Sequence, residues 1–151
     1  MSSGLTRRST ITAGAFAAFA GVLGSRLAFA DETMVMAEIK KLYGDKPMAQ
    51  GKIKLDVPEI AENGLVVPVN IEVESPMTDA DFVKSVHIYA DGNPQPGIVS
   101  YTFTPASGKA SAATRMRLAQ TQNIVCVAEM SNGSLHMAKA NIKVTIGGCG
   151  G

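Results

Sequence analysis

The sequence ends in a cysteine flanked by glycines, Gly147-Gly148-Cys149-Gly150-Gly151. Glycine has no Cβ and accepts nearly any backbone angle, so this segment has little reason to fold and its neighbours cannot shield the thiol. A thiolate is nucleophilic and oxidises readily, so an exposed cysteine is chemically reactive. We therefore interpret Cys149 as the reactive group of the chain, carried on a flexible C-terminal tail of residues 147–151.

The same thiol lacks the neighbours that a catalytic nucleophile needs. A free thiol has a pKa of about 8.5, so only a few per cent is thiolate at neutral pH, and the sequence around Cys149 supplies no base. The chain contains no Gly-x-Ser-x-Gly elbow, phosphate-binding glycine loop, His-Glu-x-x-His or Cys-x-x-Cys motif. The residues therefore predict a non-enzymatic protein with no catalytic residue, whose thiol is a group on which other enzymes act.

The second cysteine, Cys126, belongs to a strongly β-favouring run. At strand spacing Cys126 shares one face with Ile124, Ala128 and Met130, which predicts a small buried hydrophobic side chain. A disulfide with Cys149 is the alternative in an oxidising compartment, but it would require the tail to fold back onto the core. We expect no such bridge.

Other metal- or cofactor-binding residues are sparse. His87 and His136 are the only histidines, and neither has a His, Cys or carboxylate at ligand spacing. Eight methionines could indicate copper handling, because thioether sulfur is a soft ligand, but no Met-x-x-Met cluster occurs. We expect no metal site and no cofactor.

The N-terminal 30 residues have the layout of an export signal. Arg7 and Arg8 form a basic start, an apolar run covers residues 12–23, and Ala28-Phe29-Ala30 is a small-x-small cleavage site. The paired arginines favour the twin-arginine route, although Thr10 and Ile11 replace the residues usual at those positions. The sequence thus predicts a twin-arginine signal peptide over residues 1–30 and a periplasmic protein.

The predicted mature chain, residues 31–151, is long enough for one domain with a modest core. Its acidic residues slightly outnumber its basic ones, and no basic patch with interleaved aromatics remains, so nucleic acid is not expected as a partner. The mature chain has no further apolar run long enough to span a membrane. We therefore expect no membrane association of the mature form.

The periodicity of the mature chain predicts one helix followed by strands. Residues 32–43 have helical spacing, with basic residues near the end and a glycine beyond. About seven runs then alternate at period two, and Asn132-Gly133 marks a hairpin between the last two. We predict an all-β, immunoglobulin-like antiparallel β-sandwich over residues 31–146 with one N-terminal helix, and a small closed barrel as the structural alternative. Pro68, within the second run, indicates an edge or a bulge.

These features together resemble the SoxY family, the carrier subunit of bacterial thiosulfate oxidation. The resemblance rests on the twin-arginine signal, a β domain of matching size and the ending Gly-Gly-Cys-Gly-Gly, and it covers essentially the whole chain. It implies that Cys149 is the sulfur-accepting residue and that Gly147, Gly148, Gly150 and Gly151 form a swinging arm. It also implies an immunoglobulin-like domain that pairs with a SoxZ-like subunit as a heterodimer.

The resemblance further implies the partner enzymes. A c-type haem enzyme, SoxAX, joins thiosulfate to Cys149, the thiosulfohydrolase SoxB releases sulfate, and a sulfane dehydrogenase, where present, oxidises the remaining sulfur. The haem and the metal belong to those partners. Two alternatives remain open: a SoxY-like carrier of another periplasmic pathway, and a binding module in which Cys149 forms an interchain disulfide.

Overall fold

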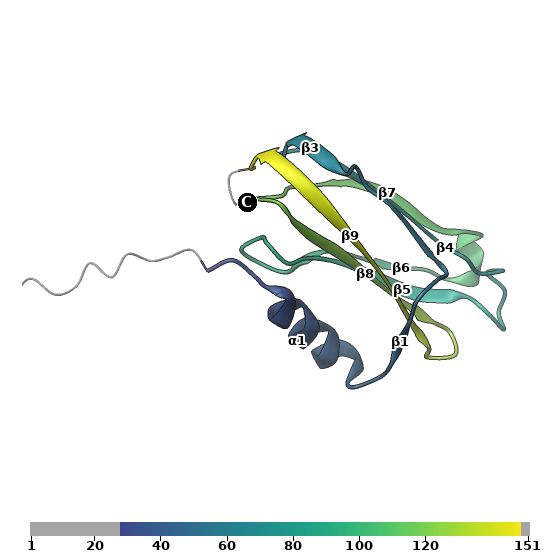
Figure 1. Ribbon diagram of the computed structural model, residues 1–151. Helices are drawn as coiled ribbons and strands as arrows, with labels where there is room; N and C mark the ends of the chain where they lie inside the picture. The colour runs from purple at the N-terminus through teal and green to yellow at the C-terminus, as the bar shows by residue number, and fades with distance from the viewer. Residues whose placement is uncertain (1–27, 149–151) are drawn as a thin grey trace, which may run out of the picture.

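The computed structural model describes residues 28–148, in which nine strands form two facing sheets with one helix outside them (Figure 1). Most of the predicted signal peptide and three arm residues, Cys149, Gly150 and Gly151, lie outside the described residues. The larger sheet has six strands in the order β1-β9-β8-β5-β6, with β3 added along β9. The smaller sheet has three, in the order β2-β4-β7. The predicted β-sandwich with one N-terminal helix is therefore confirmed.

The helix covers its predicted residues, seven strands overlap the predicted alternating runs, and two further short strands are present. The helix α1 covers Glu32–Tyr43, and the 3-10 helix η1 covers Pro105–Ser107. The strands are β1 Met48–Ala49, β2 Ile53–Asp56, β3 Ile60–Asn63, β4 Val67–Val73, β5 Val83–Ala90, β6 Gly97–Thr102, β7 Ala110–Met116, β8 Gln122–Met130 and β9 Leu135–Ile146.

The core lies between the two sheets and follows from period-two patterning. Along β4 every second residue is buried, and the alternate residues face solvent. From the other sheet β8 contributes Ile124, Cys126, Ala128 and Met130 to the same core. The predicted buried face of this strand, including Cys126, is confirmed.

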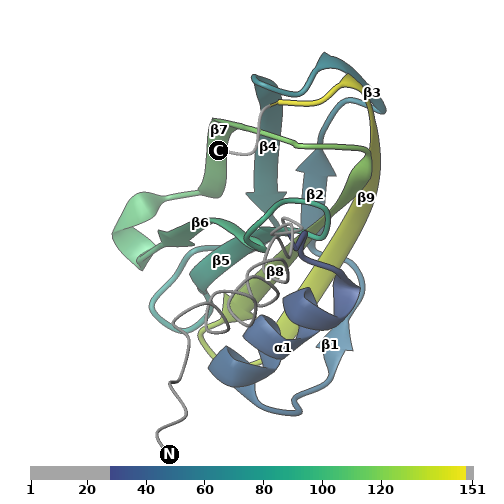
Figure 2. The same cartoon turned by 90° about the vertical axis from the view of Figure 1, so that its left-hand side faces the viewer.

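The opposite face of β8 is also buried, because α1 covers it (Figure 2). Val35 and Ile39 of the helix pack with Tyr89, Val125 and Val127 of the sheet. A strand covered on both sides carries a nearly continuous apolar run, as β8 does.

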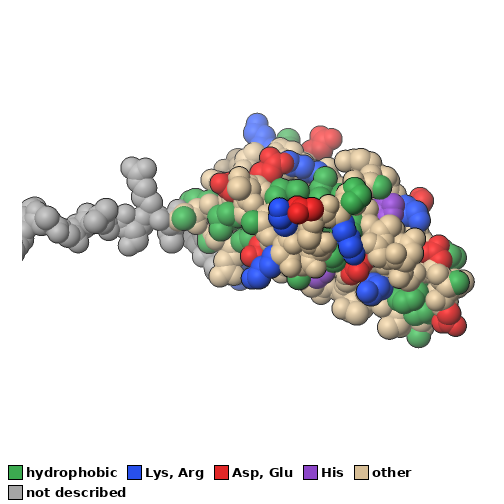
Figure 3. Space-filling model, turned by 90° about the horizontal axis from the view of Figure 1, so that it is seen from below, with side chains coloured by type: hydrophobic (Ala, Val, Ile, Leu, Met, Phe, Trp, Pro, Cys, Tyr) green, Lys and Arg blue, Asp and Glu red, His purple; other side chains and the backbone are tan. Residues whose placement is uncertain are grey.

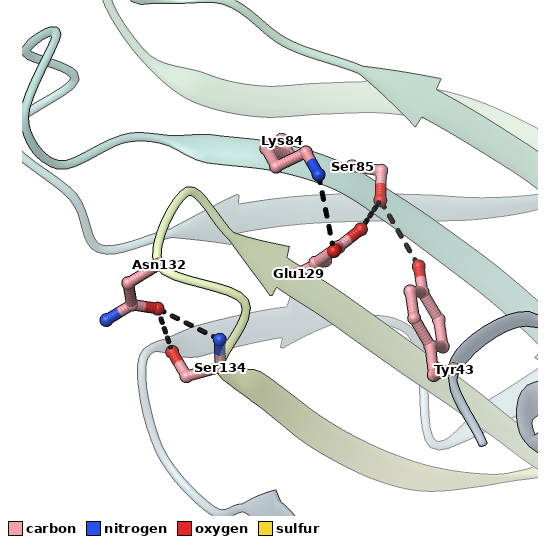
Figure 4. Close-up of polar contacts among 6 residues, drawn as sticks. All are labelled: Tyr43, Lys84, Ser85, Glu129, Asn132 and Ser134. Atoms are coloured by element: carbon pink, nitrogen blue, oxygen red, sulfur yellow. Dashed lines mark hydrogen bonds and ion pairs between the residues drawn. The ribbon is translucent and has the colours of Figure 1, made fainter. Parts of the chain in front are cut away.

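The ends of α1 are determined by local sequence. The Asp31 side chain accepts a hydrogen bond from the Met34 amide at 2.9 Å, and Gly44 ends the helix with a φ of +71°. The last helical residue is held on the sheet by a polar contact, in which the Tyr43 hydroxyl lies 3.2 Å from the Ser85 hydroxyl (Figure 4). Glu129 lies beside Ser85 and pairs with Lys84 at 3.4 Å.

The predicted hairpin at Asn132-Gly133 is confirmed as the connection between β8 and β9. The Gly133 amide donates to the Met130 carbonyl at 2.9 Å, and the Asn132 side chain accepts from the Ser134 amide at 2.9 Å (Figure 4). Gly133 has a φ of +82°, a left-handed conformation that favours glycine.

Two strands were not predicted, and both pair in parallel with β9. β1 runs beside the start of β9, and β3 runs beside its end with Ile60 opposite Lys143 and Asn63 opposite Ile146. Asn63 ends β3, and the turn that leads to β4 begins at Gly64. The cause is tertiary, because short parallel pairing depends on a distant strand.

The structure explains how Pro68 is tolerated in β4, which is the central strand of the smaller sheet. β2 pairs only with residues 70–73 of β4, so Pro68 has a neighbour on one side alone, where it lies opposite Arg115. Pro68 therefore occupies a local edge, as its missing amide donor requires.

On the face drawn in Figure 3, basic and acidic side chains are interspersed rather than gathered by sign. Within residues 28–148 no helix is long and apolar enough to cross a membrane.

Candidate functional site

The site is built on β9, because the predicted reactive residue, Cys149, follows this strand by two glycines. β9 pairs antiparallel with β8 from Leu135 to Ile142 and in parallel with β3 from Lys143 to Ile146. The strand is therefore held on one side or the other along its whole length. Cys149 itself lies outside the described residues, so its role as the covalent attachment site stays a prediction.

Gly147 and Gly148 are described, and they lie against the body of the protein. The Gly64 amide donates to the Ile146 carbonyl at 2.8 Å, and the Leu118 amide donates to the Gly64 carbonyl at 2.7 Å. The Gly148 amide then donates to the Leu118 carbonyl at 2.9 Å. This chain of backbone hydrogen bonds joins the end of β9 to the turn after β3 and to the segment after β7.

This close backbone contact requires glycine at three positions. A Cβ on Gly64 would lie 2.2 Å from the Leu118 carbonyl oxygen and 2.7 Å from the Gly148 nitrogen. A Cβ on Gly147 would lie 2.1 Å from the Ala119 carbonyl oxygen, and one on Gly148 would lie 2.9 Å from the Gly64 oxygen. We call this arrangement the arm slot, formed by Gly64, Leu118 and Ala119 around Gly147 and Gly148. None of its three glycines has a left-handed φ, so the requirement is one of space.

The contacts of the arm slot differ from the flexible tail with little reason to fold that the sequence predicts. A tail extended from Ile146 would place the Cys149 sulfur roughly 10 Å beyond the sheet. In the structure Gly147 and Gly148 instead make backbone contacts with the body, and Gly148 is buried. Full reach therefore requires the Gly148–Leu118 hydrogen bond to open. Swinging of residues 147–151 stays a prediction.

Asn93, in the turn between β5 and β6, connects the arm slot to the larger sheet through side-chain hydrogen bonds. Its side chain donates to the Arg117 carbonyl at 2.8 Å and accepts from the Ala119 amide at 3.0 Å. The buried Gln122 side chain also donates to Asn93 at 2.9 Å. The segment that accepts the Gly148 amide is thus fixed by side chains from two strand ends.

A pocket opens beside the arm slot, with Gly148 in its wall and a volume of about 280 Å³. We call it the Arg117 pocket; its lining residues are Asn93, Pro94, Gln95, Gly97, Arg117, Ala119 and Gly148. The lining contains one basic side chain and no carboxylate. Among the described residues, Arg117 takes part in no salt bridge.

Four large apolar side chains are exposed on the segments around the end of β9. They come from β3, from the turn that follows and from the last residue of β9: Ile60, Leu65, Val66 and Ile146. Exposed apolar side chains that gather on one part of a surface are candidates for a contact with another macromolecule. Sequence reasoning missed the arm slot and the Arg117 pocket, because Gly64, Asn93 and Arg117 lie far apart in the chain and carry no local signal.

The other cysteine is chemically inert in the folded chain. Cys126 is fully buried and unbridged, and burial raises the pKa of its thiol to about 12. Its thiolate population at neutral pH is therefore negligible, which removes it as a nucleophile.

The two histidines have structural surroundings. His87 lies 2.6 Å from the Ser100 hydroxyl and stacks with Tyr89, and burial lowers its pKa. His136 lies on β9 with a lowered pKa, first through burial and then through the positive charge of Lys52. Within residues 28–148 no group of three or more His, Cys, Asp or Glu side chains gathers to hold a metal ion.

Comparison with known families gives a match to the family described as sulfur oxidation protein SoxY over residues 39–149. The chain belongs to the SoxY family. The match to this family includes α1 from Ile39 onward, the whole sandwich, the arm slot and Cys149.

Solved structures agree with this membership. This SoxY-family chain is similar to the sulfur carrier protein SoxY from Chlorobium limicola f thiosulfatophilum, with 31% identity and a TM-score of 0.64 over 76% of this chain and 98% of that chain. A superoxide reductase (neelaredoxin) from Ignicoccus hospitalis matches at 18% identity and a TM-score of 0.56 over 62% of this chain and 80% of that one. At this identity the second match shows a shared fold alone. A search of curated proteins gives no match.

Proposed function

We propose that this chain is a periplasmic carrier that holds thiosulfate-derived sulfur compounds covalently on Cys149. The observation that carries the proposal is the SoxY family match, which extends through the sandwich to Cys149 itself. The similar protein from Chlorobium limicola is described as a sulfur carrier. The inert state of Cys126 supports the choice of thiol, because it leaves Cys149 as the reactive cysteine.

The loading step is an oxidation and needs an electron acceptor. Cys149 and thiosulfate combine to a cysteine S-thiosulfonate; one S–S bond forms, the thiol proton is released and two electrons leave. The electrons pass to the c-type haem of a SoxAX partner. This chain contributes the thiol and its presentation, and no cofactor of its own.

The unloading steps are carried out by other partners. A SoxB thiosulfohydrolase adds water to the thiosulfonate and releases sulfate, which leaves a persulfide and one proton. A sulfane dehydrogenase, where present, oxidises the persulfide sulfur, and SoxB then frees the thiol. The protein acts throughout as a substrate carrier and not as an enzyme.

Carrier action requires contact with several proteins. The exposed Ile60, Leu65, Val66 and Ile146 beside the arm offer an apolar contact surface, and a SoxZ-like subunit is the proposed stable partner. Export through the twin-arginine route, directed by Arg7 and Arg8, would deliver the folded heterodimer to the periplasm. Both arginines lie outside the described residues.

The decisive experiment replaces the proposed attachment atom. We expect Cys149→Ser to abolish thiosulfate-dependent electron transfer to the haem partner while the thermal unfolding curve stays unchanged. Cys126→Ala is the matched control, because it removes the other thiol and leaves Cys149 in place. Normal electron transfer in Cys149→Ser would refute the proposal.

Non-reducing mass spectrometry of the native protein separates the carrier from a module with an interchain disulfide. Thiosulfonate, sulfane or sulfonate adducts on Cys149 support the carrier. A stoichiometric disulfide dimer under all conditions contradicts it. Adducts of another chemical class would assign the same arm to a different periplasmic pathway.

A further inference from the structure

The Arg117 pocket combines three features that suit a tethered anion. Its wall includes Gly148, its one charged side chain is basic, and its volume of about 280 Å³ admits a small oxyanion. Cys149 follows Gly148 by one peptide bond, and consecutive Cα atoms are about 3.8 Å apart. The sulfur of the carrier is therefore tethered within one residue's length of the pocket.

We propose that the Arg117 pocket binds the anionic sulfonate end of the cargo on Cys149 and so holds the loaded arm in the arm slot. The proposal rests on the proposed carrier function. A guanidinium recognises a sulfonate through charge-assisted hydrogen bonds, and the lining carries no carboxylate that would repel the anion. The pocket thus distinguishes a thiosulfonate from uncharged cargo.

The surrounding contacts hold the pocket in place. Asn93 bonds the carbonyl of Arg117 and the amide of Ala119, at 2.8 and 3.0 Å, so the backbone that bears the guanidinium is anchored. The Gly148 amide bonds Leu118, the residue between them, at 2.9 Å. Binding of the cargo and seating of the arm therefore use the same three-residue segment and stabilise one another.

The charge of the adduct on Cys149 determines how often the arm occupies the slot. A sulfonate-bearing adduct adds a contact to Arg117 that an uncharged adduct cannot make. Because Arg117 is exposed, the added stabilisation is modest, and we expect the loaded arm to occupy the slot roughly two- to fivefold more. A modest gain keeps the loaded arm available to partner enzymes.

The test compares two adducts on the same thiol of the exported protein. Tetrathionate converts Cys149 to the S-thiosulfonate with release of thiosulfate and a proton, and methyl methanethiosulfonate gives the neutral methyl disulfide with release of methanesulfinic acid. Cys126 stays unmodified because it is buried. The readout is hydrogen exchange of the Gly148 amide together with the NMR shift of the Arg117 side chain.

We expect exchange of the Gly148 amide to be roughly two- to fivefold slower with the thiosulfonate than with the methyl disulfide. Arg117→Gln should remove the difference. Arg115→Gln, which deletes the same charge two residues earlier and outside the pocket, should retain it. Equal exchange for the two adducts, or a difference that survives Arg117→Gln, would overturn the proposal.

A second part of the experiment distinguishes the binding of a tethered anion from the binding of a free anion. On Cys149→Ser, free thiosulfate should shift the Arg117 side-chain signal only at millimolar concentrations, because tethering supplies a comparable effective concentration. No shift, or a shift that persists in Arg117→Gln, contradicts a site at this arginine. Chemical loading uses no partner enzyme, so a failure here leaves the carrier function standing, whereas normal electron transfer in Cys149→Ser removes the function itself.

Discussion

Glycine is required both in the β8–β9 hairpin and in the arm slot, but the physical reason differs between the two places. Gly133 has a φ of +82°, and a Cβ there would meet only the distant end of Lys46 at 3.8 Å. Gly64 and Gly147 have ordinary backbone angles, yet a Cβ on either would lie 2.1 to 2.2 Å from a carbonyl oxygen. Glycine is needed at position 133 because the backbone there is left-handed. Glycine is needed in the arm slot because there is no space for a Cβ.

The difference shows that glycines near a flexible terminus are not evidence of flexibility alone. In the arm slot they allow two backbones to approach closely enough to hydrogen-bond. The absence of a side chain at Gly147 and Gly148 lets these two residues pack against the body, and release of the arm toward partners stays a proposal. The comparison can be tested by adding one methyl group at each position.

The largest effect is expected for Gly64→Ala. The new Cβ would lie 2.2 Å from the Leu118 carbonyl oxygen, a backbone atom of the folded body, so departure of the arm would not relieve this clash. Overpacking of this kind costs about 1–3 kcal/mol of unfolding free energy, which chemical denaturation measures.

The control for this variant is Gly97→Ala. Gly97 has no left-handed φ, and nothing lies within 4 Å of a Cβ built there. Its change should stay within about 0.5 kcal/mol. An equal loss in both variants would contradict the steric account of Gly64.

An intermediate effect is expected for Gly133→Ala. The cost is conformational, about 1 kcal/mol, because alanine disfavours the left-handed region. Gly133→Asn should recover part of it, since asparagine tolerates that region better. Denaturation midpoints of the two variants give the comparison, and equal losses for Ala and Asn would indicate a steric cause instead.

Gly147→Ala should have a small effect on global stability and a large local one. The arm can leave the slot to relieve the clash with Ala119, so the unfolding free energy should change by less than about 0.5 kcal/mol. Exchange of the Gly148 amide should accelerate roughly tenfold, as its hydrogen bond to Leu118 is lost. Unchanged exchange measured by NMR would show that the slot tolerates a side chain.

The smallest effect at neutral pH concerns Cys126. Burial raises the pKa of its thiol from 9.0 to about 12, so the folded state holds this proton more tightly than the unfolded state. The resulting stability is fully present below pH 9 and is lost as the pH rises from 9 toward 12. Urea midpoints should fall more steeply over this window in the wild type than in Cys126→Ala, which also corrects for Tyr89, whose pKa is raised in the same direction. Parallel slopes would contradict this assignment.

The parts of the fold that were predicted from sequence are those determined locally. The bounds of α1 follow from Asp31 and Gly44 at its two ends, and the buried face of β8 follows from alternation along one strand. The strands β1 and β3 were missed because each is short and exists through parallel pairing with β9. Their sequences carry no signal of that distant partner.

The candidate site likewise has one part that could be predicted from the sequence and one part that could not. The identity of Cys149 as the candidate thiol could be read from five consecutive residues, and membership in the SoxY family agrees with it. The arm slot could not be read, because it consists of backbone atoms from residues 64, 118 and 147–148. Nor could the partnership of Asn93 with Arg117, which bridges 24 positions in the chain.

The Ala30 amide donates to the Asn93 carbonyl at 2.7 Å, so the residue just ahead of the predicted mature N-terminus, Asp31, lies on the loop that lines the Arg117 pocket. A fusion partner attached just ahead of α1 would therefore stand beside the Arg117 pocket and Gly148, and it would compete with proteins that approach this part of the surface. The hairpin at Asn132-Gly133 lies at the far end of β9, about 36 Å away at 3.3 Å per residue. For labels, tags or surface immobilisation, this hairpin is the better position.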